Sequence, residues 1–231
     1  ALDVLRSPIG PAATSPVRLT NRPAAVSPLA DRIDLFWAGD DGLLQSTFSV
    51  TGGVWAIPFR LGDPAVRLHP LANIVAVNRD VGTVDVFYIG RRDGDPNWRL
   101  YNTWYIVNPI AFLPVPATQM IGGTAVSLEP MAPIAACSRS PDFIDVFAVG
   151  DNGGLHNTFW QRTPPGWSAL RSVAGAPGTP TRLIGVDGCV SKTTNDVEVV
   201  ATGGDSLVYG SRWNSSLPDY AALERLASID V

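Results

Sequence analysis

A short run of apolar positions interrupted by one acid recurs four times along the chain. Each copy has a β-branched residue, an acid, four largely apolar residues and a closing glycine, at residues 33–39, 84–90, 144–150 and 197–203. The acids are 51, 60 and 53 residues apart, at Asp34, Asp85, Asp145 and Glu198. Turn-forming residues follow each copy, so each run predicts a strand that enters a β-hairpin.

Three further segments recur in step with this strand. The hairpin return repeats at residues 44–48, 100–104, 155–159 and 208–212. A first strand is predicted around residues 17–26, 66–75, 126–135 and 181–190. A fourth begins near Trp55, Trp167 and Tyr220, with an irregular counterpart at 110–112. Four strands in a repeat of about 50 residues are typical of a β-propeller blade.

The repeat predicts an all-β fold, a single β-propeller domain over residues 1–231 with four visible blade repeats. We place the blades approximately at residues 16–64, 65–124, 125–179 and 180–231. A sandwich or barrel also has short strands between turns, but has no reason to repeat one side-chain pattern in this way. Residues 1–7 resemble an outer fourth strand, which predicts that the N-terminal strand closes the ring.

The segment from Leu217 to Ala227 has two interpretations. Ser216 as N-cap, Pro218 early in the segment and the leucines that follow favour a short helix. The alternative is the fourth strand of the last blade. The N-terminal strand is then left over, and the chain is part of a larger propeller or exchanges strands with a second copy.

Composition narrows the function classes. The chain has 231 residues, of which 45% are hydrophobic and 16% charged, with a net charge of -4. The negative charge disfavours nucleic acid as a partner, and no apolar run is long enough for a membrane span. Lys192 is the single lysine, which we attribute to coding bias. A homo-oligomer and a secreted or cytoplasmic location are left open.

The two cysteines are expected to be free. Cys137 and Cys189 fall in predicted first strands of neighbouring blades, three positions apart in the repeat alignment. At about 3.3 Å per residue this offset is roughly 10 Å, too far for a direct bridge. Both are therefore predicted to be small core residues.

The repeated motifs resemble those of propeller lectins of the Photorhabdus lectin type. The third repeat matches best, with Ile-Asp-Val-Phe-x-x-Gly at residues 144–150, Gly-Leu-His-Asn-Thr-Phe-Trp at 154–160 and Gly-Trp-Ser at 166–168. The resemblance implies a β-propeller that binds carbohydrate, commonly fucose or related sugars, in shallow sites between blades. The chain departs from the family in its smaller number of blades and in a disturbed second repeat at residues 91–98 and 109–116.

Candidate sugar-binding residues combine aromatic rings, which stack on a sugar's apolar face, with polar groups for its hydroxyls. In repeat order they are Gln45, Trp55, Tyr101, Trp104, His156, Asn157, Trp160, Trp167, Tyr209 and Trp213. Core packing between blades is the competing interpretation, and the favoured one for Trp55 and Trp167. Trp160 and Trp213, outside the strict repeat, are better ligand candidates. His156 has the alternative of a hydrogen bond to backbone.

The repeated acids are expected to be structural, accepting hydrogen bonds from backbone N–H groups or arginine in each blade. No calcium-loop, metal-site or cofactor motif is present in the sequence, and no catalytic motif. A glycosidase acting through Asp80, Asp142 or Asp187 is a less favoured reading. The sequence therefore predicts a non-enzymatic lectin that binds glycans at repeated weak sites, whose multivalency raises avidity. The alternative is a propeller scaffold for protein–protein interaction, as one module of a larger secreted or toxin-like protein.

Overall fold

The computed structural model describes residues 22–50, 53–107, 117–173, 182–191 and 195–228. All regular structure in these residues is β-strand, arranged in four antiparallel sheets. The first sheet contains β1 (Ala24–Leu29), β2 (Arg32–Ala38), β3 (Leu44–Val50) and β4 (Phe59–Arg60). The second contains β5 (Val66–Leu68), β6 (Ile74–Asp80), β7 (Thr83–Arg92), β8 (Arg99–Ile106) and β9 (Ala117–Met120).

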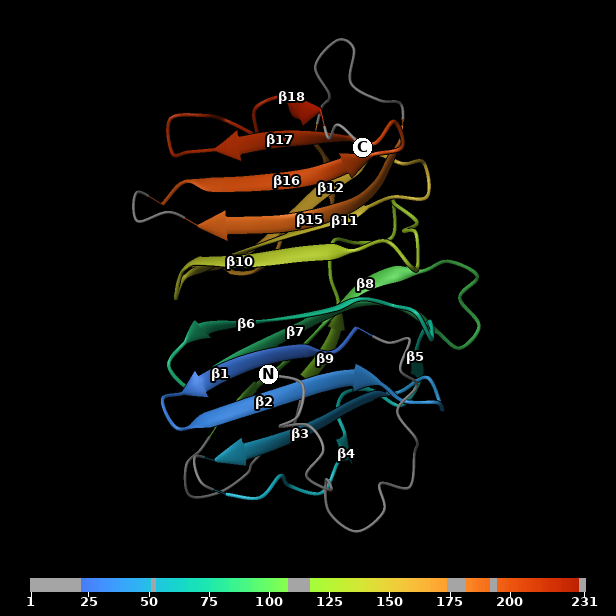
Figure 1. The fold of residues 1–231 in the computed structure, drawn as a ribbon, viewed down its shortest axis with the longest axis vertical. Helices are drawn as coiled ribbons and strands as arrows, with labels where there is room; N and C mark the ends of the chain where they lie inside the picture. Colours follow the sequence, from blue (N-terminus) through green and yellow to red (C-terminus); the bar gives the residue numbers. More distant parts are fainter. Residues whose placement is uncertain (1–21, 51–52, 108–116, 174–181, 192–194, 229–231) are drawn as a thin grey trace.

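The other two sheets have the same up-and-down order. The third contains β10 (Ile134–Ser140), β11 (Phe143–Val149), β12 (Leu155–Arg162), β13 (Pro165–Trp167) and β14 (Arg171–Ser172). The fourth contains β15 (Leu183–Ser191), β16 (Val197–Gly203), β17 (Leu207–Trp213) and β18 (Glu224–Ser228). The inner strands β1, β6, β10 and β15 lie side by side in one column, with successive strands in contact (Figure 1). The four sheets are therefore consecutive blades of a β-propeller, as the repeat predicts.

The hydrophobic core lies between blades. Alternate residues of β7 point to opposite faces, so Val84 and Val86 pack toward the first blade and Phe87 and Ile89 toward the third. A third cluster, which includes Phe147, fills the space between the third and fourth blades. The strand β16 of the fourth blade alternates buried and half-buried residues, whereas β7 and β11 have a neighbouring blade on both faces and are apolar almost throughout. The repeated acid is the exception in each run.

Hairpin turns have the chemistry expected from the sequence. In the third blade Gly150 N donates to Gly154 O at 2.9 Å, and Asn152 Oδ1 accepts from Gly154 N at 2.9 Å. Gly153 has a positive φ of 77°, and a Cβ there would lie 2.8 Å from the Arg182 backbone. This position therefore requires glycine.

The predicted helix from Leu217 to Ala227 is wrong, because β18 occupies its second half and pairs with β17. Before it, Asn214 Oδ1 accepts from Ser216 N at 3.0 Å in a turn, and Ala221 N donates to Arg212 O at 2.8 Å. The unpaired backbone groups at the edge of β17 require partners, and satisfying them outweighs the local capping signal. The predicted closing strand at residues 1–7 and the counterpart at 110–112 lie outside the described residues.

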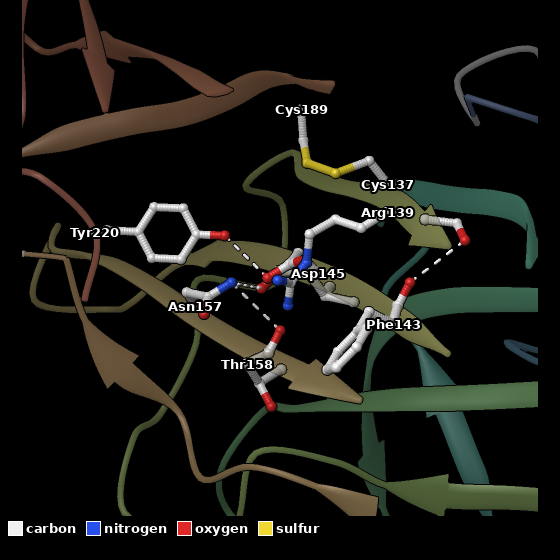
Figure 2. Close-up of a disulfide and its surroundings, with 10 residues drawn as sticks. Cys137, Arg139, Phe143, Asp145, Asn157, Thr158, Cys189 and Tyr220 are labelled. Atoms are coloured by element: carbon white, nitrogen blue, oxygen red, sulfur yellow. Dashed lines mark hydrogen bonds and ion pairs between the residues drawn. A yellow bond between two sulfur atoms is a disulfide. The ribbon is translucent and has the colours of Figure 1, made fainter. Parts of the chain in front are cut away.

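The prediction of free cysteines is also wrong, since Cys137 and Cys189 form a disulfide with 5.8 Å between their Cα atoms (Figure 2). Cys137 lies opposite Asp145, whereas Val190 lies opposite Glu198. When the third and fourth repeats are aligned on their acids, Cys137 therefore matches Val190. Cys189 comes directly before Val190, so the two cysteines are one position apart. The error arose because the spacing between the first-strand leucine and the inner strand varies between blades. Side chains alternate between the two faces along a strand, and neighbouring blades contact each other through opposite faces. Two residues one position apart in the repeat therefore point toward each other across the interface.

Candidate functional site

Two cavities occupy the same place in the repeat. One, of about 440 Å³, lies between the second and third blades, and we call it the 2–3 cavity. The other, of about 310 Å³, lies between the third and fourth blades and is called the 3–4 cavity. Their volumes fall at the lower end of the roughly 300–1,000 Å³ typical of small-molecule sites.

A buried ion pair lies on one wall of each cavity. Arg79 Nε lies 3.4 Å from Asp85 Oδ2 in the 2–3 cavity, and Arg139 Nε pairs with Asp145 Oδ2 in the 3–4 cavity. Both arginines stand at a register shift near the end of an inner strand, β6 or β10, which turns them toward the acid of the next strand. Both acids are at most 2% exposed.

Amide side chains extend this polar wall. Asn102 Nδ2 donates to Asp85 Oδ1 at 3.3 Å, and Gln119 Nε2 donates to Asn102 Oδ1 at 3.4 Å. The equivalent Asn157 donates through Nδ2 to Val146 O at 3.3 Å, and Arg171 lies opposite it on β14. Each cavity therefore presents several hydrogen-bonding groups from one blade.

Aromatic rings of the following blade form the opposite wall. The Arg79 guanidinium carbon lies 4.1 Å from the Trp160 ring centroid, and that of Arg139 lies 4.4 Å from the Trp213 centroid. Trp160 and Trp213 hold the same repeat position, opposite Ile144 and Val197. These two tryptophans are therefore in register with each other, contrary to the sequence interpretation.

Burial dominates the electrostatics of the acids. Desolvation raises the pKa of Asp85 to about 6, despite the opposing charge of Arg79 and the Asn102 hydrogen bond. Desolvation also raises the pKa of Asp145, against the effect of Arg139 and of a hydrogen bond from Tyr220. The expectation that each acid accepts hydrogen bonds from an arginine is confirmed for Asp145, and for Asp34 with Arg32.

The interface between the first and second blades has a different arrangement. Arg32 comes from the same strand as Asp34, with Nη2 2.7 Å from Asp34 Oδ1, and its guanidinium carbon lies 4.0 Å from the Phe48 centroid. Tyr105 holds the position of Trp160, and burial together with the nearby Asp34 carboxylate raises the pKa of its hydroxyl. Ser46 replaces the asparagine found in the next two blades.

The structure brings five of the ten predicted site residues to these cavities. Trp104, Trp160 and Trp167 line the 2–3 cavity, and Asn157 and Trp213 line the 3–4 cavity. Trp55 is half-buried and lines neither of the two. The other four share one repeat position near the hairpin turn and are buried: Gln45, Tyr101, His156 and Tyr209.

His156 illustrates the environment of that position. Its ring packs against Gly150, whose Cβ position would lie 2.8 Å from Nε2. Burial lowers the pKa of the imidazole. Neither ring nitrogen has a hydrogen-bond partner in the part of the chain that the structure describes. The structure thus places His156 in the packed interior and not at either cavity.

Sequence reasoning missed Arg79 and Arg139 as site residues. The available signal was an arginine six residues before the repeated acid, present in the second and third repeats. Attributing the excess of arginine to coding bias concealed this spacing.

No helix among the described residues could span a membrane. The described residues also contain no cluster of three or more histidine, cysteine or acidic side chains able to hold a metal ion.

Comparison with known proteins identifies the fold. No protein-family model and no curated protein sequence matches the chain. Among solved structures, the lectin BP39L from Burkholderia pseudomallei superposes with a TM-score of 0.68 at 20% identity, over 95% of this chain and 59% of that one. A mutant of AofleA from Arthrobotrys oligospora superposes with a TM-score of 0.61 at 16% identity, over 88% of this chain and 56% of that one.

The fucose-specific lectin from Aleuria aurantia gives a TM-score of 0.61 at 14% identity, over 92% of this chain and 63% of that one. It is described as a six-bladed β-propeller. The chain thus spans about three-fifths of the length of these lectins. At sequence identities of 20% or less, structural similarity establishes the fold alone. The predicted resemblance to propeller lectins is therefore confirmed for the fold.

Proposed function

We propose that this protein is a non-enzymatic lectin whose sugar sites are the 2–3 and 3–4 cavities. The observation that carries the proposal is a buried arginine–aspartate pair facing a tryptophan of the next blade, present in both cavities. A carboxylate accepts and a guanidinium donates, so together they match the adjacent hydroxyls of a sugar. The indole face suits the sugar's apolar C–H surface.

Fucosides are the first sugar class to test. The superposed Aleuria aurantia lectin is fucose-specific, and a mutant of it is known in complex with α-methyl-L-fucoside. In this chain Trp104, Met120 and Trp160 add apolar surface to the 2–3 cavity, which suits a deoxy sugar. The assignment of fucose rests on these neighbours and on that surface together.

The acid content of the 2–3 cavity supports binding without catalysis. Glycoside hydrolysis commonly uses two carboxyl groups, about 5–5.5 Å or 6.5–9.5 Å apart. Asp85 is the one carboxylate among the described residues that line this cavity. A protein-interaction scaffold is the competing function, but its signature is a broad apolar patch. Trp160 and Trp213 instead stand beside charged groups.

A glycan array tests the proposal. The chain and a Trp160→Ala, Trp213→Ala double variant are screened side by side, with Trp55→Ala as the control because Trp55 lines neither cavity. Circular dichroism confirms that each variant is folded. We expect a coherent set of fucosylated glycans to bind the chain and the control, with at least tenfold weaker binding by the double variant. Silence across the array, or full binding by the double variant, would contradict the proposal.

A further inference from the structure

The two cavities differ in the residue at one equivalent position. Ser168 N donates to Phe159 O at 2.9 Å, and Ala221 N donates to Arg212 O at 2.8 Å. These matching backbone bonds make Trp167, which precedes Ser168, the counterpart of Tyr220, which precedes Ala221. Trp167 lines the 2–3 cavity and Tyr220 the 3–4 cavity.

Tyr220 hydrogen-bonds to the acid of its cavity. Its hydroxyl donates to Asp145 Oδ1 at 2.9 Å, and Figure 2 shows the ring directed at that carboxylate. The ring is held by an edge contact with Phe147, with 5.2 Å between centroids and an interplanar angle of 87°. A phenol O–H in this position makes the same bond that a sugar hydroxyl would make. The Oδ1 atom of Asp145 is therefore already satisfied.

In the 2–3 cavity, the residue equivalent to Tyr220 is Trp167, which does not donate a hydrogen bond to Asp85. Asp85 Oδ2 is buried and has no hydrogen-bond partner among the described residues, and its contact with Arg79 Nε is long at 3.4 Å. The indole Nε1 of Trp167 is likewise buried without a hydrogen-bond partner in the described chain. An acceptor and a donor are thus left unsatisfied beside one cavity. Buried polar groups of this kind are uncommon in folded proteins and gain from a ligand that pairs with them.

We propose that the two sites are unequal, and that Tyr220 weakens sugar binding in the 3–4 cavity by occupying Asp145 as a sugar hydroxyl would. The 2–3 cavity, with Trp167 in the equivalent place, is then the high-affinity site. This inference rests on the proposed function. Gaining or losing one hydrogen bond to a charged group changes the dissociation constant by about ten- to hundredfold.

Calorimetric titration with methyl α-L-fucoside tests the inequality one site at a time. Trp213→Ala leaves the 2–3 cavity intact, and Trp160→Ala leaves the 3–4 cavity intact. We expect at least tenfold tighter binding by the Trp213→Ala variant. In the Trp160→Ala background, adding Tyr220→Phe removes the hydroxyl and keeps the ring, and we expect affinity to rise about tenfold or more.

Two further variants separate this role from a structural one. Tyr220→Trp installs the residue of the other cavity and should produce the same gain, whereas Trp167→Tyr in the Trp213→Ala background should weaken binding by the 2–3 cavity. Structural damage does not raise affinity, so the gain identifies the role of the hydroxyl. Equal affinities with no effect of Tyr220→Phe would overturn this inference and leave the proposed function standing. Absence of binding by the unsubstituted chain and by all variants would overturn both.

Discussion

Single side chains decide the character of the cavities, and the arginines illustrate how. Arg79 and Arg139 each contact an acid of their own blade and a tryptophan of the next. Their position near the end of an inner strand, where the strand register shifts, could not be inferred from the repeat of apolar residues. The acids could be found because they recur in every repeat. Lys192 stands six residues before Glu198 in the sequence, which continues the same spacing with another cation.

Removing Arg79 is expected to destabilise the protein strongly. Arg79→Ala leaves the buried Asp85 without its ion partner, and breaking a buried pair in this way costs about 3–5 kcal/mol. Arg162 and Asp142 form a matched control, because both side chains of that ion pair are more than half exposed. Arg162→Ala should cost at most about 1 kcal/mol. Urea unfolding of the two variants measures the difference, and equal losses would contradict the account.

Asp85 also predicts a pH dependence of stability. Burial raises its pKa to about 6 from 3.8, so the folded state retains a proton that the unfolded state releases between these values. The free energy of unfolding therefore falls as pH rises from about 4 through 6, by up to about 1.4 kcal/mol per pH unit from this group. Asp34 and Asp145, whose pKa values are also raised, add to the trend.

Urea unfolding at several pH values checks this dependence. In Asp85→Asn the contribution of Asp85 to the slope should disappear, while that of the other two acids remains. A slope that is the same in the variant and the unsubstituted chain would show that Asp85 is not the titrating group.

At the scale of strands, the sequence predicts the middle of each blade well. The strands β2, β7, β11 and β16 follow the repeated acid pattern, and in β7 and β11 burial on both faces leaves a continuous apolar run. Outer strands are harder to predict, since they are short and pair on one side. Local capping residues around Ser216 therefore suggested a helix, although pairing with β17 determines that β18 is a strand.

Two leucines distinguish the strand from the predicted helix. Leu223 is 4% exposed and belongs to the core between the third and fourth blades, whereas Leu226 is 59% exposed. In a helix, residues three apart share a face and would have similar burial. Leu223→Ala should cost about 2–5 kcal/mol and Leu226→Ala less than about 1 kcal/mol. Thermal unfolding of both variants gives the comparison, and similar costs would favour the helix.

At the scale of the whole molecule, each blade is a single sheet that depends on its neighbours for its core. The three clusters between successive blades show this directly. The disulfide adds a covalent link across one of these interfaces, because Cys137 belongs to the third blade and Cys189 to the fourth. The alignment on the first-strand leucine missed it, because the spacing from that leucine to the inner strand differs between blades, whereas alignment on the repeated acids places the cysteines one position apart.

Breaking this link should loosen the fourth blade against the third. The cysteines are 52 residues apart, and closing a loop of this length typically contributes about 2–4 kcal/mol. A Cys137→Ser, Cys189→Ser double variant is therefore expected to unfold at a lower temperature than the oxidised chain. A thiol assay confirms that the unsubstituted chain has the disulfide. An unchanged melting temperature would show that packing alone holds this interface.

The central claim is that sugars bind between blades against particular tryptophans. The chain has seven tryptophans, and four of them line the two cavities: Trp104, Trp160, Trp167 and Trp213. The other three line neither: Trp37, Trp55 and Trp98. Each indole N–H gives its own nuclear magnetic resonance signal, which single Trp→Phe variants assign.

Titration of these seven signals with methyl α-L-fucoside is the most direct test. We expect the signals of the four cavity tryptophans to move, with those of Trp160 and Trp167 moving at lower sugar concentration than that of Trp213. The other three should stay in place. Movement confined to Trp37, Trp55 or Trp98, or no movement of any signal at saturating sugar, would contradict the assignment of the inter-blade cavities as fucoside sites.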